Sequence, residues 1–91
     1  MSTWAVEFSA RARKQIRKLD RPIAQRIIIE LEKLEKSERP QVHCKPLTGD
    51  LSGLWRYRAG DYRVILDFDR GQLVILAIRD RASLDGLQKV A

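Results

Sequence analysis

The sequence predicts an α+β fold, in which an N-terminal strand and an antiparallel two-helix hairpin precede a three-stranded antiparallel meander, with the helices packed on one face of the sheet. Two observations predict this class. Apolar residues recur at helical spacing in the first half of the chain, whereas they alternate with polar residues in the second half. Glycines between the alternating segments mark tight turns, which join antiparallel strands. A chain of 91 residues is the size of one small domain, so we expect a single domain over residues 1–91.

The first half of the chain predicts a strand followed by two helices. Residues 4–8 are expected to form the strand, and Ser9 is a good N-cap for the helix that follows. The apolar side of that helix contains Ala12, Ile16 and Leu19. Asp20 and Pro22 separate the helices, because Asp is a favourable N-cap and Pro is tolerated in a first turn. The second helix carries an apolar stripe that contains Ile23, Ile27, Leu31 and Leu34, widened by Ala24 and Ile28.

The second half of the chain predicts a loop and three strands. Residues 37–40 end the second helix, and residues 41–53 contain proline and glycine without periodicity, so we expect a loop there. The strands are expected at residues 54–59, 62–68 and 72–79. Residues 82–90 carry a weak helical pattern that Gly86 interrupts.

The first turn of the meander determines which residues lie opposite each other. Gly60 and Asp61 suit a two-residue type II′ turn, because glycine tolerates the positive φ of the first position. That turn places Arg58 opposite Arg63 on the neighbouring strand. Like charges directly opposite each other destabilise a sheet, so this pair suggests that an anion normally lies across this face.

The second turn is expected to be a three-residue loop over residues 69–71, which places Ile65 opposite Ile75 and Arg63 opposite Ala77. Because side chains alternate along a strand, the sheet then has one basic face and one apolar face. The basic face is predicted to contain Arg56, Arg58, Arg63 and Arg79. The face that the helices cover is predicted to contain Tyr57, Val64, Leu66, Phe68, Val74, Leu76 and Ile78.

The charge and cysteine content limit the classes of function. Lys and Arg number 18 against 12 Asp and Glu, which gives a formal net charge of +6 and favours nucleic acid or an acidic protein as partner. Cys44 is the single cysteine, so the chain has no intramolecular disulfide and no thiolate cluster for a metal, and a reducing compartment is expected. No long hydrophobic run predicts a secretory signal or a membrane span. We therefore expect a cytoplasmic protein with no membrane partner.

Two segments resemble one known family. Residues 45–49 read K-P-L-T-G, and residues 53–64 read G-L-W-R-Y-R-A-G-D-Y-R-V. Together with the predicted order of elements, they resemble the RelE-like branch of the RelE/ParE toxin superfamily. The resemblance implies a toxin of a type II toxin–antitoxin module that acts as a ribosome-dependent mRNA interferase, cutting by attack of the ribose 2′-hydroxyl without a metal or other cofactor. It also implies three partners: a RelB-like protein antitoxin, the ribosome and mRNA.

The resemblance also implies roles for individual basic residues. Arg63 and Arg81 match the catalytic positions, and Arg79 competes with Arg81 for the position after the last strand. Those that match RNA-binding positions are Lys45, Arg56, Arg58 and Arg79. Arginine suits both tasks, because its guanidinium is always charged and can bind two phosphate oxygens.

One part of the RelE pattern is missing. No Tyr or His follows Tyr62, so the residue that takes the 2′-hydroxyl proton has no obvious identity. The candidates for this base are Asp61, Asp80 and Asp85.

Three other interpretations stay open at this point. The chain could be a ParE-like toxin that binds and inhibits DNA gyrase, which the missing Tyr or His favours. It could instead be an inactive toxin homologue that regulates transcription together with its antitoxin. The arginines could also be a solvated surface or a dock for acidic residues of a partner.

Overall fold

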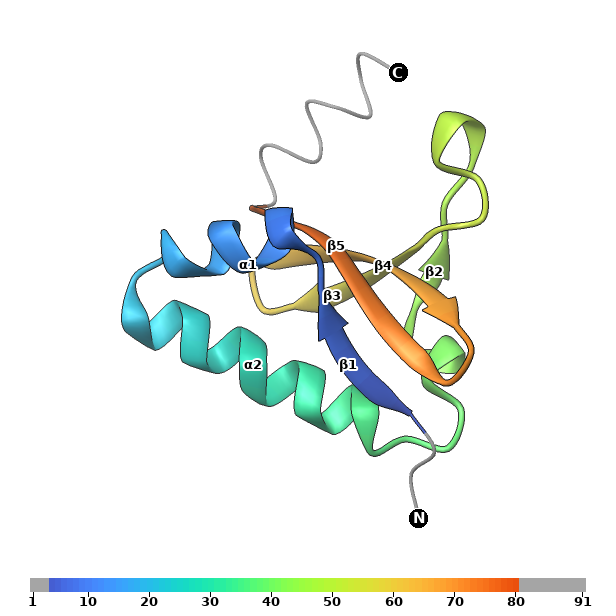
Figure 1. The fold of residues 1–91 in the computed structure, drawn as a ribbon, viewed down its shortest axis with the longest axis horizontal. Coiled ribbons are helices and arrows are strands. Elements are labelled where there is room, and N and C mark those ends of the chain that lie inside the picture. Colours follow the sequence, from blue (N-terminus) through green and yellow to red (C-terminus); the bar gives the residue numbers. More distant parts are fainter. Residues whose placement is uncertain (1–3, 81–91) are drawn as a thin grey trace.

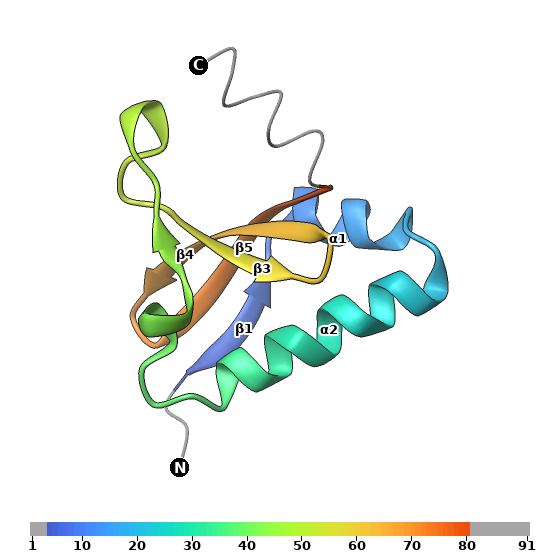
Figure 2. The same cartoon turned by 180° about the vertical axis from the view of Figure 1, so that it is seen from behind.

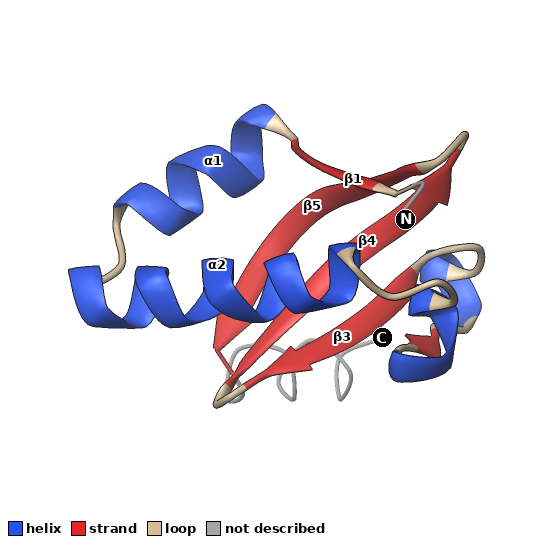
Figure 3. Cartoon of the chain, turned by 90° about the horizontal axis from the view of Figure 1, so that it is seen from below, coloured by secondary structure: helices blue, strands red, loops and turns tan. Residues whose placement is uncertain are grey.

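The computed structural model describes residues 4–80, which form two helices and a five-stranded sheet (Figure 1). The strands are β1 (Ala5–Phe8), β2 (Lys45–Pro46), β3 (Trp55–Ala59), β4 (Tyr62–Asp69) and β5 (Gln72–Asp80). Their order in the sheet is β1-β5-β4-β3-β2, with β1 parallel to β5 and the other neighbours antiparallel. Helices α1 (Ala10–Arg17) and α2 (Arg21–Glu35) lie on one side of the sheet (Figures 2 and 3). The predicted α+β class is confirmed.

The helix boundaries follow the predicted capping residues in part. The Ser9 Oγ accepts a hydrogen bond from the Ala12 N–H at 3.1 Å, as expected for an N-cap. Asp20 occupies the N-cap position of α2, but its side chain makes no capping hydrogen bond. Ile28 was predicted to widen the buried stripe and is instead 40% exposed. It follows the buried Ile27 by one residue, a rotation of about 100° around the helix that turns it away from the sheet.

The β3–β4 hairpin has the predicted register. Gly60 has a φ of +64°, and Asp61 does not have a positive φ, as a type II′ turn requires. Arg58 lies opposite Arg63, and Tyr57 lies opposite Val64.

The β4–β5 hairpin differs from the prediction at two points. Its turn contains two residues, Arg70 and Gly71, both with positive φ, and Asp69 pairs directly with Gln72. A β-bulge follows, because Leu66 pairs with Ile75 while its neighbour Ile65 pairs with Ala77. Leu76 is thus an extra residue on β5. The predicted three-residue loop over residues 69–71 is wrong.

This register corrects the predicted faces of β5. Ile65 lies opposite Ala77 and not opposite Ile75, while Arg63 lies opposite Arg79 and not opposite Ala77. Val74 and Leu76 were predicted to face the helices, but the fully buried residues of this segment are Leu73 and Ile75. A shift of one residue moves side chains to the other face of a strand. The shorter turn causes that shift for residues 72–75, and the bulge reverses it for residues 77–80.

The core lies between the helices and the sheet, and its buried residues are Ala12, Ile27, Leu31, Leu34, Ala59, Val64, Leu66, Leu73, Ile75 and Ile78. Tyr57 and Phe68, the aromatic side chains predicted for this face, pack against the core, and Trp55 packs there as well. Residues 41–53 are not simply a loop. They include strand β2, most of the short 3₁₀ helix η1 (Pro40–His43) and all of η2 (Gly49–Leu51).

Helix α1 and its N-cap residue Ser9 make hydrogen bonds to β5 that strand β1 is too short to make. Beyond Phe8, the Ser9 N–H donates to the Ile75 carbonyl at 2.9 Å, and the Ser9 Oγ donates to the Leu76 carbonyl at 3.2 Å. The Ile78 N–H then donates to the Gln15 Oε1 at 2.6 Å. These contacts hold the end of β5, and therefore Arg79, in place.

We expect Gln15→Leu to lower the free energy of unfolding by about 1–3 kcal/mol, because it removes the acceptor of the Ile78 N–H. Ile78 is only 6% exposed, so water cannot readily replace that acceptor. Gln15→Glu is the matched control, since its carboxylate can still accept this hydrogen bond. Urea unfolding of both variants measures the effect. Equal stability of Gln15→Leu and the unaltered chain would show that this contact does not hold β5.

Candidate functional site

Three arginines from neighbouring strands form a row across the open face of the sheet. Arg58 on β3 lies opposite Arg63 on β4, which lies opposite Arg79 on β5. We call these three residues the arginine row. Neighbouring strands are about 4.8 Å apart, so the backbone of the row spans about 9.6 Å. Arg58 is exposed, and Arg63 and Arg79 are half-buried. The structure therefore brings together three of the predicted site residues, and places Arg79 closer to Arg63 than expected.

The next row along the strands joins the other predicted basic residues to an apolar centre. Lys45 lies opposite Arg56, and Arg56 lies opposite Ile65, which in turn lies opposite Ala77. Ile65 and Ala77 are 7% and 8% exposed, and Leu47 and Leu54 pack against them. The face predicted to be basic thus contains a small apolar cluster beside its arginines.

Three arginines of this face form no ion pair with a carboxylate within residues 4–80. Arg58 makes one hydrogen bond there, from Nε to the Gly60 carbonyl at 3.5 Å. Arg63 donates from Nη1 to the Tyr62 carbonyl at 3.5 Å. In that part of the chain Arg56, Arg58 and Arg79 form no ion pair. Guanidinium groups on adjacent strands repel each other, so an anion bound across them would be stabilised.

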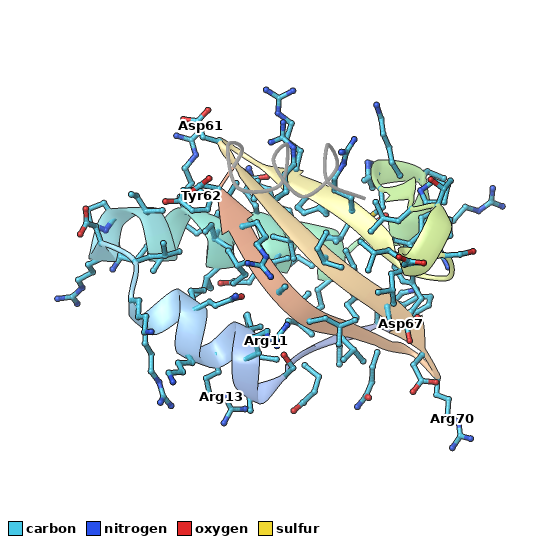
Figure 4. All side chains as sticks on the ribbon, turned by 90° about the horizontal axis from the view of Figure 1, so that it is seen from above. Arg11, Arg13, Asp61, Tyr62, Asp67 and Arg70 are labelled. Atoms are coloured by element: carbon cyan, nitrogen blue, oxygen red, sulfur yellow. The ribbon has the colours of Figure 1, made fainter. Side chains whose placement is uncertain are left out.

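Two of the predicted candidates for the proton-accepting base lie within the described residues. Asp61 is exposed in the β3–β4 turn, next to Tyr62 (Figure 4). Asp80 lies opposite Tyr62, whose ring packs against the core, so strand alternation places Asp80 on the helix side of the sheet, away from the arginine row. The predicted Asp85 and the predicted catalytic Arg81 lie outside the described residues.

Tyr57 belongs to the core side of the sheet, where it joins β3 to α2. Its hydroxyl donates to the Glu30 Oε2 at 3.2 Å and lies 3.4 Å from the Glu30 carbonyl oxygen. Burial, followed by the negative charge of Glu30, raises the pKa of Tyr57 to about 12. Tyr57 therefore stays protonated near neutral pH and is unsuited to act as a base.

Cys44 is unsuited to act as a nucleophile. Its thiol donates to the Pro40 carbonyl at 3.4 Å, and burial raises its pKa to about 11. A thiol with such a pKa is almost entirely protonated near pH 7. No cluster of three or more His, Cys, Asp or Glu side chains that could hold a metal ion occurs among residues 4–80. In the same range, no helix is long and apolar enough to cross a membrane.

Carboxylates at the end of the open face far from the arginine row were missed by sequence reasoning. Asp67 is two residues after Ile65 and four after Arg63 on β4, so strand alternation places it on the open face with them. It lies near the C-terminal end of β4, whereas Tyr62 lies at the N-terminal end (Figure 4). Glu7 lies between Val6 and Phe8, which pack on the core, so it also points to the open face. Both lie opposite Val74. Strand alternation could have located Asp67, but Glu7 requires the pairing of β1 with β5.

Comparisons with known proteins agree with this architecture. A family model described as the ParE toxin of the type II toxin–antitoxin system parDE matches residues 6–84. A chain of the RelBE2 toxin–antitoxin complex from Mycobacterium tuberculosis is 30% identical, with a TM-score of 0.73 over 86% of this chain and 98% of that one. A chain of the archaeal RelE–RelB complex from Pyrococcus horikoshii is 28% identical, with a TM-score of 0.64 over 87% and 96%.

More distant structures share the fold alone. A chain of the YoeB–YefM complex from Staphylococcus aureus is 15% identical, with a TM-score of 0.66 over 84% of this chain and 94% of that one. The search of curated proteins found no match. Because the family model covers most of the chain and the arginine row occupies the open face of a RelE-like sheet, this chain belongs to the ParE toxin family of type II toxin–antitoxin systems, within the RelE/ParE superfamily.

Proposed function

We propose that this toxin is an endoribonuclease that cuts mRNA on the ribosome and is silenced by a RelB-like protein antitoxin. The observation that carries the proposal is the arginine row, which aligns three guanidinium groups across adjacent strands. Such an array suits a phosphodiester, because each guanidinium can donate two parallel hydrogen bonds to phosphate oxygens. The 30% identity to a chain of a RelBE complex supports the RelE-like reading.

The reaction is a transesterification within the RNA. The ribose 2′-oxygen attacks the adjacent phosphorus and loses its proton to a base, while the bond from phosphorus to the 5′-oxygen breaks and that oxygen gains a proton. The products are a 2′,3′-cyclic phosphate and a 5′-hydroxyl. Negative charge grows on the non-bridging oxygens in the transition state, and positioned cations stabilise that charge.

In this proposal some of the basic residues act in catalysis and the others bind RNA. Arg63 is the middle member of the arginine row and donates to the phosphate under attack, while Arg81 assists the leaving oxygen. The residues that bind and position the RNA are Lys45, Arg56, Arg58 and Arg79. Asp61 is the candidate base within the described residues, because Asp80 lies on the other side of the sheet.

A second candidate function is inhibition of DNA gyrase by binding. The match to a model of ParE toxins favours it, as does the absence of any Tyr or His after Tyr62. In that case the same basic face would bind a protein or DNA without cutting RNA. An inactive homologue that regulates transcription with its antitoxin would do neither.

Two assays run side by side test these candidates. The first is translation in vitro followed by primer extension on the message, and the second is DNA supercoiling by gyrase. We expect new mRNA ends that require both the toxin and the ribosome, with supercoiling unchanged. Loss of supercoiling without new mRNA ends would support the gyrase candidate, and no effect in either assay would support the regulatory one.

The antitoxin is expected to act by covering the basic face. An extended acidic segment would gain charge-assisted hydrogen bonds from the arginines and exclude RNA from them. The chains similar to this one in the M. tuberculosis and P. horikoshii structures come from toxin–antitoxin complexes. A cytoplasmic location fits a protein that acts on ribosomes.

A further inference from the structure

The open face of the sheet is basic at one end and acidic at the other. The arginine row lies at the end nearest the β3–β4 turn. Four residues further along β4, about 13 Å away, lies Asp67, and Glu7 is on the same face two strands across. The charge on this face therefore reverses along the strands, although the chain as a whole carries a net charge of +6.

The region between the two ends is apolar. Ile65 and Ala77 lie between the arginine row and the acidic end, and Leu47 and Leu54 pack on them. A nucleic-acid backbone that ran along the strands would leave the arginines, cross this apolar cluster and then meet two carboxylates. Each of those steps is unfavourable, because a phosphate loses its water over apolar groups and is repelled by like charge.

A path across the strands meets neither obstacle. It passes from Arg79 over Arg63 to Arg58, and Arg56 and Lys45 lie beside its β3 end. This path keeps the phosphates over cations throughout.

We propose that the bound phosphodiester backbone crosses the sheet along the arginine row, and that Asp67 and Glu7 exclude it from the rest of the open face. The inference rests on the proposed function, because it takes a nucleic-acid strand as the ligand. It assigns Asp67 and Glu7 a role in specificity: they limit the length of strand that the toxin contacts and set its direction across the sheet.

The test uses single-stranded oligothymidylate of increasing length, which lacks the 2′-hydroxyl and cannot be cut by the proposed reaction. Binding is followed by fluorescence anisotropy over a series of salt concentrations. Each phosphate contact to a single strand adds about 0.7 to the slope of log affinity against log salt. For the unaltered chain we expect this slope to stop rising at a short length, because only the arginine end makes contacts.

The main variant combines Glu7→Lys and Asp67→Lys, which extends the basic surface along the strands. We expect its slope to exceed that of the unaltered chain by up to about 1.4 with long oligonucleotides and to be the same with short ones. The matched control combines Glu32→Lys and Glu38→Lys, which make the same charge change at exposed positions on α2 and just beyond it. If the main variant behaves like this control at every length, the inferred path is wrong.

A second variant covers the case in which the lysines prevent folding. Glu7→Gln with Asp67→Asn keeps the size of each side chain and removes only the repulsion, so affinity for long oligonucleotides should rise several-fold with no change for short ones. An unchanged affinity for long oligonucleotides overturns the path. If Arg58→Ala with Arg63→Ala binds as tightly as the unaltered chain, the path and the binding surface are both wrong. Binding that needs the arginines, without cleavage on the ribosome, supports the path and contradicts only the nuclease function.

Discussion

Replacing both Arg58 and Arg63 by alanine is expected to abolish growth arrest while leaving the fold intact or slightly more stable. These residues lie directly opposite each other on β3 and β4, so they repel in the free protein. Removing like charges at such a pair stabilises a sheet by a few tenths of a kcal/mol. The same change removes two of the three guanidinium groups of the arginine row. Growth after induction without antitoxin, together with thermal unfolding of the purified variant, measures both effects.

The control for this prediction removes the same amount of charge elsewhere. Arg11 and Arg13 are exposed on helix α1 and not on the strands that carry the arginine row (Figure 4). Arg11→Ala with Arg13→Ala should leave growth arrest unchanged. A soluble, folded Arg58→Ala, Arg63→Ala variant that still stops growth would exclude the arginine row from the toxic activity.

Arg63→Ala alone is expected to lower the rate of cleavage by about 100- to 1000-fold at saturating ribosome. That is the usual cost of removing a donor aimed at charge that develops in the transition state. Arg63 is the central residue of the arginine row, between Arg58 and Arg79. It is also two residues before Ile65, which belongs to the buried apolar cluster. Arg81→Ala is expected to have an effect of similar size. Single-turnover cleavage of ribosome-bound mRNA measures these rates.

Arg56→Ala is the comparison that separates a role in RNA binding from the catalytic role proposed for Arg63. Arg56 lies at the side of the apolar cluster, between Lys45 and Ile65, and is expected to contribute to binding rather than to the chemical step. Its loss should raise the ribosome concentration needed for half-maximal rate and leave the saturated rate nearly unchanged. A normal saturated rate for Arg63→Ala would show that the catalytic assignment is wrong.

The β3–β4 hairpin could be predicted from sequence because its turn contains a glycine at the position that requires a positive φ. Gly60 accepts a positive φ without strain, so the turn length and the register follow directly from Gly60 and Asp61. The second hairpin could not be predicted in this way. Its turn places a non-glycine residue, Arg70, at a φ of +50°, a conformation that the sequence does not suggest.

Two deviations in that hairpin have opposite effects on the predicted face of β5. The turn is one residue shorter than expected, which moves Leu73 and Ile75 into the core in place of Val74. The bulge at Leu76 then adds one residue and restores the predicted alternation. Arg79 therefore lies on the predicted face, although its neighbour Arg63 was expected to lie opposite Ala77. A bulge depends on contacts between strands, which is why the sequence of one strand does not reveal it.

The candidate site was predictable to a similar extent. Strand alternation was enough to place Arg56, Arg58 and Arg63 on one face, because they belong to the β3–β4 hairpin, whose turn could be predicted. The apolar cluster around Ile65 was not predicted, because Leu47 comes from a segment without periodicity. The acidic end was not predicted either, because Glu7 reaches this face only through the parallel pairing of β1 with β5.

In the proposed reaction, the arginine row stabilises a phosphodiester while the 2′-oxygen attacks it. The most direct test is to analyse the ends of ribosome-bound mRNA after exposure to the purified toxin. We expect a 2′,3′-cyclic phosphate on the upstream fragment and a 5′-hydroxyl on the downstream one, and we expect Arg63→Ala to produce neither end. Intact mRNA with the unaltered toxin, or fragments that carry a 5′-phosphate, would contradict it.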